Sequence, residues 1–309
     1  MELRSDLWID QPDAHERIDQ RATAGLVTDD EAAQLHCFVD EGFVKLALPV
    51  DEAFSAGFDA DVARIWERRP DDLAIALFDG PTSFADYDGR VRNVGYRIPD
   101  LHSHSPHALD LYLQPQLFRI IELIYGQPAI AFQSLYFEYG SQQALHRDPM
   151  YVVTKPVSHL LASWVALEDI APESGPLAYV PKSHRLPWFE FQPGTVACGQ
   201  GVTAEQRDSF ERWKQDTIRE RNLSVETFTC RRGDAFIWHG GLLHGGSRIA
   251  DRAHTRKSFV VHYCTAGNYS TRRATMRVRD GGEWRREQRQ TDRIIERERS
   301  RGLDNPLRT

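Results

Sequence analysis

Two short motifs that lie far apart in the sequence place the strongest constraint on how this chain can fold. His146-Arg147-Asp148 follows a run rich in β-branched and aromatic residues, and His244 lies 98 residues further on, counted from 146 to 244. Residues two apart in a strand point the same way, so His146 and Asp148 can converge on one ion where their strand ends. His244 must then arrive from a different strand. Two imidazoles and one carboxylate on one side of an ion are a ligand set for Fe(II) that leaves three coordination positions open.

The order of the expected elements favours a β-rich core behind a helical N-terminal part. Residues 1–25 are polar and predict a loose arm or a short helix. Thr28 and Glu31 then form the pattern of a capping box at a helix start. Apolar spacing predicts helices near 29–40, 51–69 and 115–125, and strands near 43–46, 129–139, 152–153, 159–167, 177–180, 225–230, 235–238 and 257–264. Helices followed by many short strands predict an α+β fold with a β-sandwich or barrel core.

Two stretches interrupt this pattern, and a third follows it. Residues 70–110 read as irregular, and residues 186–229 break the strand rhythm with an amphipathic stretch at 204–221, which we interpret as an inserted helical segment. Both are expected to wall a substrate pocket. We expect a single domain over 1–309 with its core at about 28–265, followed by a charged C-terminal extension at 266–309 that includes a solvated helix near 283–301.

Composition excludes several kinds of partner. The net charge of −7 argues against general nucleic-acid binding, and no apolar run approaches the ~20 residues that span a bilayer. The N-terminus lacks the apolar core of a secretory signal. Four scattered cysteines without a C-x-x-C pair predict reduced thiols: Cys37, Cys198, Cys230 and Cys264. We therefore expect a cytoplasmic protein, a monomer or homodimer, that acts on a small molecule and binds neither nucleic acid nor membrane.

A cation near the three ligands would complete the site. A 2-oxo acid can fill two of the open positions and leave the last for O2, and its far carboxylate then needs a cation, for which the planar fork of arginine suits best. Arg256 begins an apolar strand twelve residues after His244, whereas Arg248 and Arg252 compete from the polar loop before it. His239 competes with His244 as the distal ligand. A histidine cluster at His102, His104 and His107 is interpreted as a polar surface loop.

The motifs as a set resemble the phytanoyl-CoA dioxygenase family of Fe(II)/2-oxoglutarate-dependent hydroxylases, which includes ectoine hydroxylases. The resemblance covers roughly 28–46 and 129–263. It is carried by His146-x-Asp148 and by the segments 173–177 (Glu-Ser-Gly-Pro-Leu), 180–184 (Val-Pro-Lys-Ser-His), 233–244 (Gly-Asp-Ala-Phe-Ile-Trp-His-Gly-Gly-Leu-Leu-His) and 256–263 (Arg-Lys-Ser-Phe-Val-Val-His-Tyr). It implies a double-stranded β-helix (jelly-roll, cupin-like) core with flanking N-terminal helices.

The same resemblance implies the cofactors and further site residues. Iron would bind His146, Asp148 and His244, and 2-oxoglutarate would be anchored by Arg256, with no catalytic side chain beyond the metal ligands. Two further residues match positions that approach 2-oxoglutarate in some members, Trp164 and Ser247, and Gln133 matches a substrate-facing position. One departure is that Gly246 reads as a single insertion, which shifts Ser247 and Arg256 together by one residue.

The expected reaction is hydroxylation or another oxidation of an unactivated C–H bond in a small metabolite or natural-product intermediate, with release of succinate and CO2. Halogenating relatives replace the ligand aspartate with a small residue, and Asp148 is intact. The alternative is a non-oxygenase cupin-like isomerase or small-molecule binding protein. Such proteins commonly carry further His or Glu ligands near the first pair, and Arg147, Pro149 and Met150 cannot serve as these.

Overall fold

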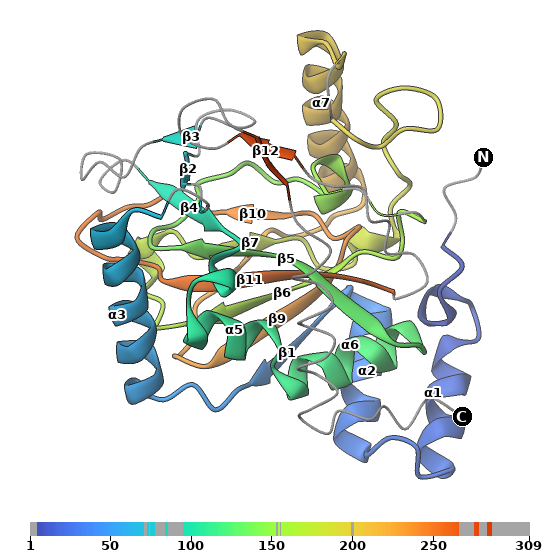
Figure 1. Ribbon diagram of the computed structural model, residues 1–309. Coiled ribbons are helices and arrows are strands. Elements are labelled where there is room, and N and C mark those ends of the chain that lie inside the picture. Colours follow the sequence, from blue (N-terminus) through green and yellow to red (C-terminus); the bar gives the residue numbers. More distant parts are fainter. Residues whose placement is uncertain are drawn as a thin grey trace.

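The architecture is described from a computed structural model of the chain (Figure 1). It describes residues 5–70, 73, 75–77, 95–152, 154, 156–198 and 201–265, and the backbone alone at 84–85, 275–277 and 283–285.

Helices dominate the described part of the first 125 residues, and one further α-helix lies later in the described chain. The α-helices are α1 (Ala14–Thr23), α2 (Asp29–Glu41), α3 (Glu52–Arg68), α5 (Pro106–Tyr112), α6 (Pro115–Tyr125) and α7 (Ala204–Glu220). Short 3-10 turns lie at η1 (Trp8–Asp10), η2 (Leu101–Ser103), η3 (Asp148–Met150), η4 (Pro172–Ser174) and η5 (Ser183–Arg185). The capping box that starts α2 is confirmed: Thr28 Oγ1 accepts a 3.1 Å hydrogen bond from the Glu31 amide, and the Glu31 carboxylate accepts a 2.9 Å bond from the Thr28 amide.

The strands form two facing sheets and one separate ribbon. The large sheet has the order β1-β9-β6-β11-β5-β4-β2-β3, and the small sheet has the order β10-β7-β8. Their bounds are β1 (Phe43–Ala47), β2 (Ile75–Leu77), β3 (Phe84–Ala85), β4 (Tyr96–Pro99), β5 (Ala129–Phe137), β6 (Leu161–Ala166), β7 (Leu177–Tyr179), β8 (Glu226–Phe228), β9 (Asp234–His239), β10 (His244–Gly246) and β11 (Ser258–Thr265). The ribbon pairs β12 (Thr275–Arg277) with β13 (Glu283–Arg285). The pairs within the two facing sheets are antiparallel, as a jelly roll requires.

Strand alternation divides the core into an outer and an inner layer. On β11, Phe259, Val261 and Tyr263 pack in an outer cluster with apolar residues of α2, α3, α5 and α6, which cover that face of the large sheet (Figure 1). Val260 points the other way and packs in an inner cluster with Trp164 on β6. The inner layer lies between the two sheets, and the candidate site is built there.

The inserted helix α7 projects from the top of the molecule in Figure 1 and is tied to the first motif by two buried cations. Lys214 donates to the carbonyl of Leu145 at 2.8 Å. Arg147 donates to the carbonyls of Ser183, Leu186 and Pro187 at 2.8 to 3.1 Å and stacks on Trp188 and Trp213. Burial lowers the pKa of Arg147 to about 9. These carbonyls accept hydrogen bonds from both terminal nitrogens of a buried guanidinium that no carboxylate within the described residues neutralises.

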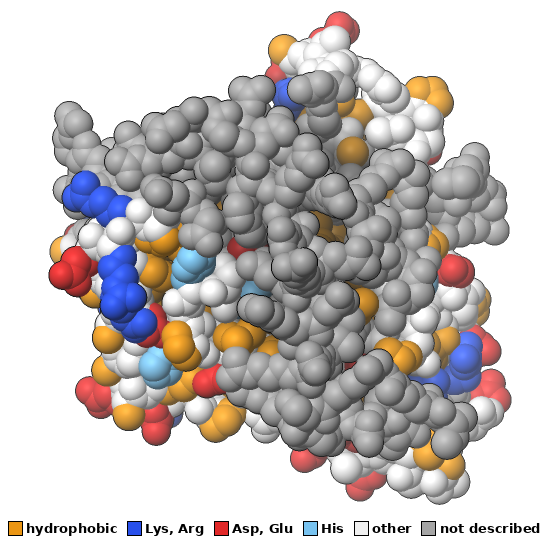
Figure 2. All heavy atoms as spheres, in the orientation of Figure 1, with side chains coloured by type: hydrophobic (Ala, Val, Ile, Leu, Met, Phe, Trp, Pro, Cys, Tyr) orange, Lys and Arg blue, Asp and Glu red, His pale blue; other side chains and the backbone are white. Residues whose placement is uncertain are grey.

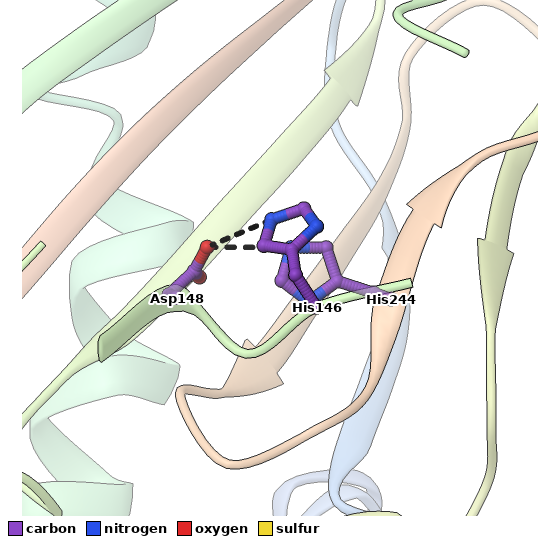
Figure 3. Close-up of side chains that lie close together, drawn as sticks. All are labelled: His146, Asp148 and His244. Carbon is purple, nitrogen blue, oxygen red and sulfur yellow. Dashed lines mark ion pairs between the residues drawn. The ribbon is translucent and has the colours of Figure 1, made fainter. Parts of the chain in front are cut away.

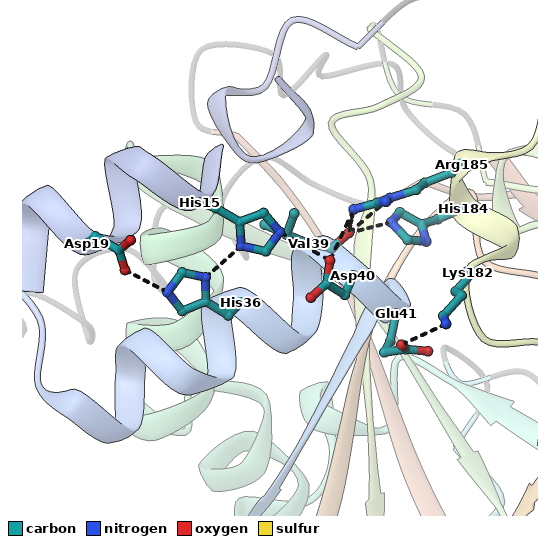
Figure 4. A network of polar contacts seen from close by, with 9 residues as sticks. All are labelled: His15, Asp19, His36, Val39, Asp40, Glu41, Lys182, His184 and Arg185. Atoms are coloured by element: carbon teal, nitrogen blue, oxygen red, sulfur yellow. Dashed lines mark hydrogen bonds and ion pairs between the residues drawn. The ribbon is translucent and has the colours of Figure 1, made fainter. Parts of the chain in front are cut away.

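A polar network joins α1, α2 and the turn at η5 (Figure 4). His36 bonds Asp19 at 3.0 Å and His15 at 2.7 Å, and His15 bonds Asp40 at 3.1 Å. The neighbouring guanidinium of Arg185 donates to the Val39 carbonyl at 2.6 Å. The network fixes the N-terminal helices against the strand connection that precedes the insertion.

Three sequence expectations are wrong in part. Residues 70–110 contain β4 and α5, whose Ser105 side chain caps the helix by accepting from Ala108 N; the short apolar runs there gave no clear period. Val152 lies in a turn after η3, and Val153 lies outside the described residues. Glu283–Arg285 is a strand, whereas a helix was expected there, and the remainder of 286–301 lies outside the described residues.

No helix of the described part is both long and apolar enough to cross a membrane. The outward surface carries mixed charge. On the face in Figure 2, acidic side chains lie beside basic ones at both edges of the coloured surface.

Candidate metal centre

The structure brings His146, Asp148 and His244 together at the inner face. Backbone hydrogen bonds of 2.8 and 3.0 Å join His146 to His244 as an isolated antiparallel bridge, so the two motifs meet as neighbouring extended segments. Asp148 begins η3 directly after this bridge. One ligand atom from each side chain lies within 4.8 Å of the other two (Figure 3).

Close backbone packing permits this approach. At Gly245, the residue after His244, a Cβ atom would lie 2.5 Å from the carbonyl oxygen of Gln143, so a larger residue would push β10 away from the segment that carries His146. Glycine removes that obstacle.

Each of the two ligand imidazoles is oriented by a backbone carbonyl two residues earlier in the chain. His146 Nδ1 lies 2.9 Å from the carbonyl of Ala144, and His244 Nδ1 lies 3.0 Å from the carbonyl of Leu242. A carbonyl accepts only from a protonated nitrogen, so each Nδ1 carries the hydrogen and each Nε2 keeps its lone pair. The two Nε2 atoms lie 3.7 and 3.3 Å from Asp148 Oδ1. Three lone-pair donors therefore converge on one point.

The electrostatics favour an ionised aspartate. Burial alone would raise the pKa of Asp148, but the charge of His244 and the polar contacts with the surrounding imidazoles outweigh it and hold the pKa well below its ordinary range. Burial lowers the pKa of His146, whereas Asp148 overcomes burial at His244 and raises its pKa. A cation between these groups would take the place of the proton that the site otherwise attracts.

Two inner-face side chains hold the second oxygen of the aspartate. Trp238 Nε1 donates to Asp148 Oδ2 at 2.8 Å, and His262 Nε2 lies 3.8 Å from the same oxygen. The hydrogen bond from Trp238 leaves Oδ1 turned toward the two imidazoles, which is how an outer partner orients a ligating carboxylate.

Arg256 lies in the inner layer, at the end where β11 begins. Its side chain is 3% exposed, and its guanidinium carbon lies 5.6 Å from the ring centres of both Phe137 and Trp164. Within the described chain it forms no salt bridge, and its one side-chain hydrogen bond is a long 3.5 Å contact to the Tyr139 carbonyl. Burial lowers its pKa to about 10. Arg248 and Arg252, the competing arginines, are exposed.

For the other three predicted site residues, the described part of the chain shows no hydrogen bond or ion pair to the metal ligands. Trp164 is buried beside Arg256 and its Nε1 has no partner among the described atoms. Gln133 lies on β5 opposite His262 of β11, and its buried Oε1 is likewise without a partner there. Ser247 is half-buried just after β10, where its amide donates to the Pro176 carbonyl; within the described part no hydrogen bond joins its side chain to His244 or Arg256.

Three inner-face residues were missed by the sequence analysis: Arg97, Ser258 and His262. On β11 the spacing of Arg256, Ser258 and His262 follows the period of two, so strand alternation could have found Ser258 and His262. Arg97 had no such pattern around it, because β4 was not expected.

The other histidines occupy structural positions. His239 lies 3.4 Å from Asp10 and accepts from the Gly241 amide, and His184 contacts the Val39 carbonyl at 3.2 Å. The expected surface loop is wrong for His102, which is buried, stacks on Tyr112 at 3.8 Å and bonds Ser134.

The histidine at 107 also has a structural partner. His107 Nδ1 bonds Asp61 at 2.8 Å, and Asp61 sits on α3, more than forty residues earlier in the sequence. Sequence spacing alone could not reveal that carboxylate.

Comparisons with known proteins agree with this geometry. A sequence model described as "Phytanoyl-CoA dioxygenase (PhyH)" matches residues 38–257. Phytanoyl-CoA dioxygenase domain-containing protein 1 of Mus musculus is 26% identical over 179 residues, which are 54% of this chain and 55% of the relative. The chain thus spans about half the length of the curated relatives it matches.

Solved structures share the fold at low identity. The non-heme alpha ketoglutarate dependent carbocyclase SnoK from nogalamycin biosynthesis is 17% identical with a TM-score of 0.57, over 79% of this chain and 86% of that one. EctD from S. alaskensis with bound Fe is 17% identical with a TM-score of 0.56, over 78% of each chain. The expected jelly-roll core with flanking helices is therefore confirmed. Because the family model spans more than two thirds of the chain, this protein belongs to the phytanoyl-CoA dioxygenase family.

Proposed function

We propose that the protein is an Fe(II)- and 2-oxoglutarate-dependent oxygenase that oxidises a small molecule. The observation that carries the proposal is the convergence of three lone-pair donors, from His146, Asp148 and His244, within 4.8 Å of one another at a buried point. Family membership supports the same conclusion, since the family name denotes a dioxygenase.

The donor set suits iron. Two neutral imidazoles and one carboxylate form the facial arrangement typical of non-haem Fe(II) oxygenases and leave an open side. The hydrogen bonds at each Nδ1 and at Asp148 Oδ2 orient all three ligands before any metal arrives.

The cation and its surroundings suit 2-oxoglutarate. Arg256 is a buried guanidinium without a carboxylate partner in the described chain, and its Nε has no hydrogen-bond partner there. A buried charge is costly unless it is paired, so a bound carboxylate would supply the missing partner. Trp164 Nε1 is a second unsatisfied donor beside it. We propose Arg256 and Trp164 as cosubstrate contacts, and we propose weaker roles for Ser247 and Gln133.

When bound, iron with 2-oxoglutarate and O2 supplies an oxidant for an unactivated C–H bond, with release of succinate and CO2. The chain's own residues orient the ligands, hold the cosubstrate carboxylate and exclude water: the described residues around the site are largely buried. We propose hydroxylation as the outcome. Solved structures that share the fold include a carbocyclase and an epimerase, so the same residues are compatible with other oxidations.

The alternative, a non-oxygenase cupin-like isomerase or binding protein, has less support. It does not account for a buried Arg256 without a carboxylate partner in the described chain, and the family match does not favour it. We also propose that the chain forms one catalytic domain with its core at 28–265, works in the cytoplasm, and binds no nucleic acid.

The experiment is Fe(II)-dependent turnover of 2-oxoglutarate. Purified protein is incubated with Fe(II), ascorbate, O2 and 2-oxoglutarate, with and without a library of small metabolites, and succinate is quantified. We expect succinate that requires Fe(II), disappears in Asp148→Ala, and is unchanged in His254→Ala, a matched change at an exposed histidine. Succinate release that is equal in Asp148→Ala and the parent would contradict the proposal.

A further inference from the structure

Arg97 is a second inner-face arginine that the proposed chemistry does not use. It pairs with Phe137 across β4 and β5, and directly opposite residues in an antiparallel pair project from the same face. Phe137 belongs to the inner cluster, whereas Tyr96 and Ile98, the neighbours of Arg97, belong to the outer one. The side chain of Arg97 therefore projects into the space between the sheets.

No residue that the structure describes supplies a counter-ion for Arg97. It is half-buried, and it forms no hydrogen bond or ion pair with any residue that the structure describes. Burial lowers its pKa, opposed only by the neighbouring hydroxyl of Tyr151. The ring of Tyr151 packs edge-on against His146 at 5.3 Å. Tyr151 is thus close enough to Arg97 to influence its pKa, and it also contacts the first metal ligand.

Arg97 and Arg256 are suited to different ligands. In the large sheet the order β6-β11-β5-β4 places β4 two strands beyond β11. Arg256 contacts Trp164 of β6 and the near side of Phe137, whereas Arg97 lies on the far side of Phe137. A single 2-oxoglutarate bound at Arg256 would leave Arg97 available.

Two unsatisfied polar groups face each other across β5 and β11, and one of them lies near a metal ligand. Gln133 Oε1 and His262 Nδ1 are buried without a hydrogen-bond partner among the described residues, and the two residues face each other in register. His262 Nε2 lies 3.8 Å from Asp148 Oδ2. An unsatisfied buried polar atom costs about 1–3 kcal/mol, so a ligand that bonds both atoms would recover that free energy.

We propose that the substrate is a small organic oxyanion whose carboxylate or phosphate binds Arg97 and whose hydroxyl or amino group bonds Gln133 and His262. This inference rests on the proposed function and names the substrate class for the same site. The hydroxyl or amino group, rather than the anion, lies beside the metal, so oxidation falls on carbon atoms next to it.

The spacing of the two ends limits the size of the substrate. Gln133 and Phe137 are four residues apart on one strand, which corresponds to about 13 Å between their Cα atoms. Side chains from both ends shorten the span. A compact hydroxy or amino acid fits such a span, whereas a molecule with a large additional group would exceed it.

The test is a binding measurement without turnover. The protein is loaded with Zn(II), which is redox-inert, and with saturating 2-oxoglutarate, so that Arg256 is occupied. The probes are linear ω-hydroxy carboxylates of increasing chain length, the corresponding ω-hydroxyalkyl phosphates, and the primary amides of the acids as neutral controls. Affinities are measured by calorimetry or ligand-observed NMR.

We expect at least one oxyanion series to bind about tenfold or more tightly than its amides, with an optimum at intermediate length. Arg97→Met should abolish that preference and Arg97→Lys should keep part of it, while Arg248→Met, at an exposed arginine, should change nothing. Gln133→Leu and His262→Phe should weaken ω-hydroxy acids but not acids that lack the hydroxyl. The carboxylate and phosphate arms show which oxyanion is preferred.

Equal binding of acids and amides, no measurable binding of either oxyanion series, or a preference that survives in Arg97→Met would overturn the inference. Retained Zn(II) and 2-oxoglutarate binding shows that each variant is folded; if Arg97→Met does not fold, Arg97→Gln takes its place. Failure of 2-oxoglutarate to bind the parent protein would instead overturn the proposed function, so the two failures are distinguishable.

Discussion

Replacing Arg256 by methionine should change stability and cosubstrate binding in opposite directions. Burial lowers the pKa of Arg256 to about 10, and a depression of that size corresponds to about 3 kcal/mol of lost solvation. Methionine keeps apolar contact with Phe137 and Trp164. It gives up the long hydrogen bond to the Tyr139 carbonyl, which contributes at most about 1 kcal/mol. The ligand-free variant should therefore be about 1–3 kcal/mol more stable than the parent.

The same change should impair 2-oxoglutarate binding. Removing one partner of a buried, hydrogen-bonded charge pair costs about 2–5 kcal/mol, which corresponds to an affinity lower by roughly 30-fold to several thousand-fold. At a cosubstrate concentration of about 100 times the parent's Kd, the parent gains ~2.7 kcal/mol of stability, and the variant should gain less than about 1 kcal/mol.

The assay is urea unfolding of the Zn(II)-loaded protein with and without 2-oxoglutarate, together with calorimetric titration of 2-oxoglutarate. Arg248→Met is the matched control, because that arginine is exposed, and it should leave both quantities unchanged. A variant that is markedly less stable than the parent and still binds 2-oxoglutarate normally would refute the reasoning, because Arg256 would then be a structural residue.

Three further outcomes are expected. Trp238→Phe removes the 2.8 Å hydrogen bond to Asp148 while keeping an aromatic ring, so metal affinity measured against a competing chelator should fall by about 10–100-fold; unchanged affinity would contradict the orienting role. Thr28→Ala removes the capping oxygen of α2 and should lower the free energy of unfolding in urea by about 1 kcal/mol, whereas no loss would show that the cap is redundant. The hydrogen bond from Arg119 lowers the pKa of Glu31, so the stability that this pair contributes should be present above the ordinary pKa of about 4.3 and be lost as pH falls. The free energy of unfolding of Glu31→Gln should therefore differ from that of the parent at pH 6 but not at pH 2.5. A difference that persists in acid would argue against the pair.

The parts of the fold that sequence could predict are those with a local period. The capping box and apolar stripe of α2 indicated a helix, and its bounds are close to those expected. Alternation on β11 placed Arg256 at a strand start, and the separation of His146 from His244 predicted that two distant strands meet. The structure brings these residues together, and their roles stay predictions until a metal is measured.

The parts that sequence could not predict depend on contacts between distant segments. The burial of His102 follows from stacking on Tyr112 of α5, a helix too short to show a clear apolar period. The inward direction of Arg97 follows from its pairing with Phe137, and register between strands is not readable from one of them alone. A lone arginine in a short apolar run gave no reason to place it in the space between the sheets.

The most direct measurement of the central claim is the visible charge-transfer absorption of an Fe(II)–2-oxoglutarate chelate under anaerobic conditions. Fe(II) is added to the metal-free protein, and 2-oxoglutarate is then titrated into it. We expect a band that saturates at one equivalent of iron, is absent in Asp148→Ala and His244→Ala, requires far more 2-oxoglutarate in Arg256→Met, and is unchanged in His254→Ala. Iron binding with no band at any 2-oxoglutarate concentration, or a band that persists without Asp148, would contradict the central claim.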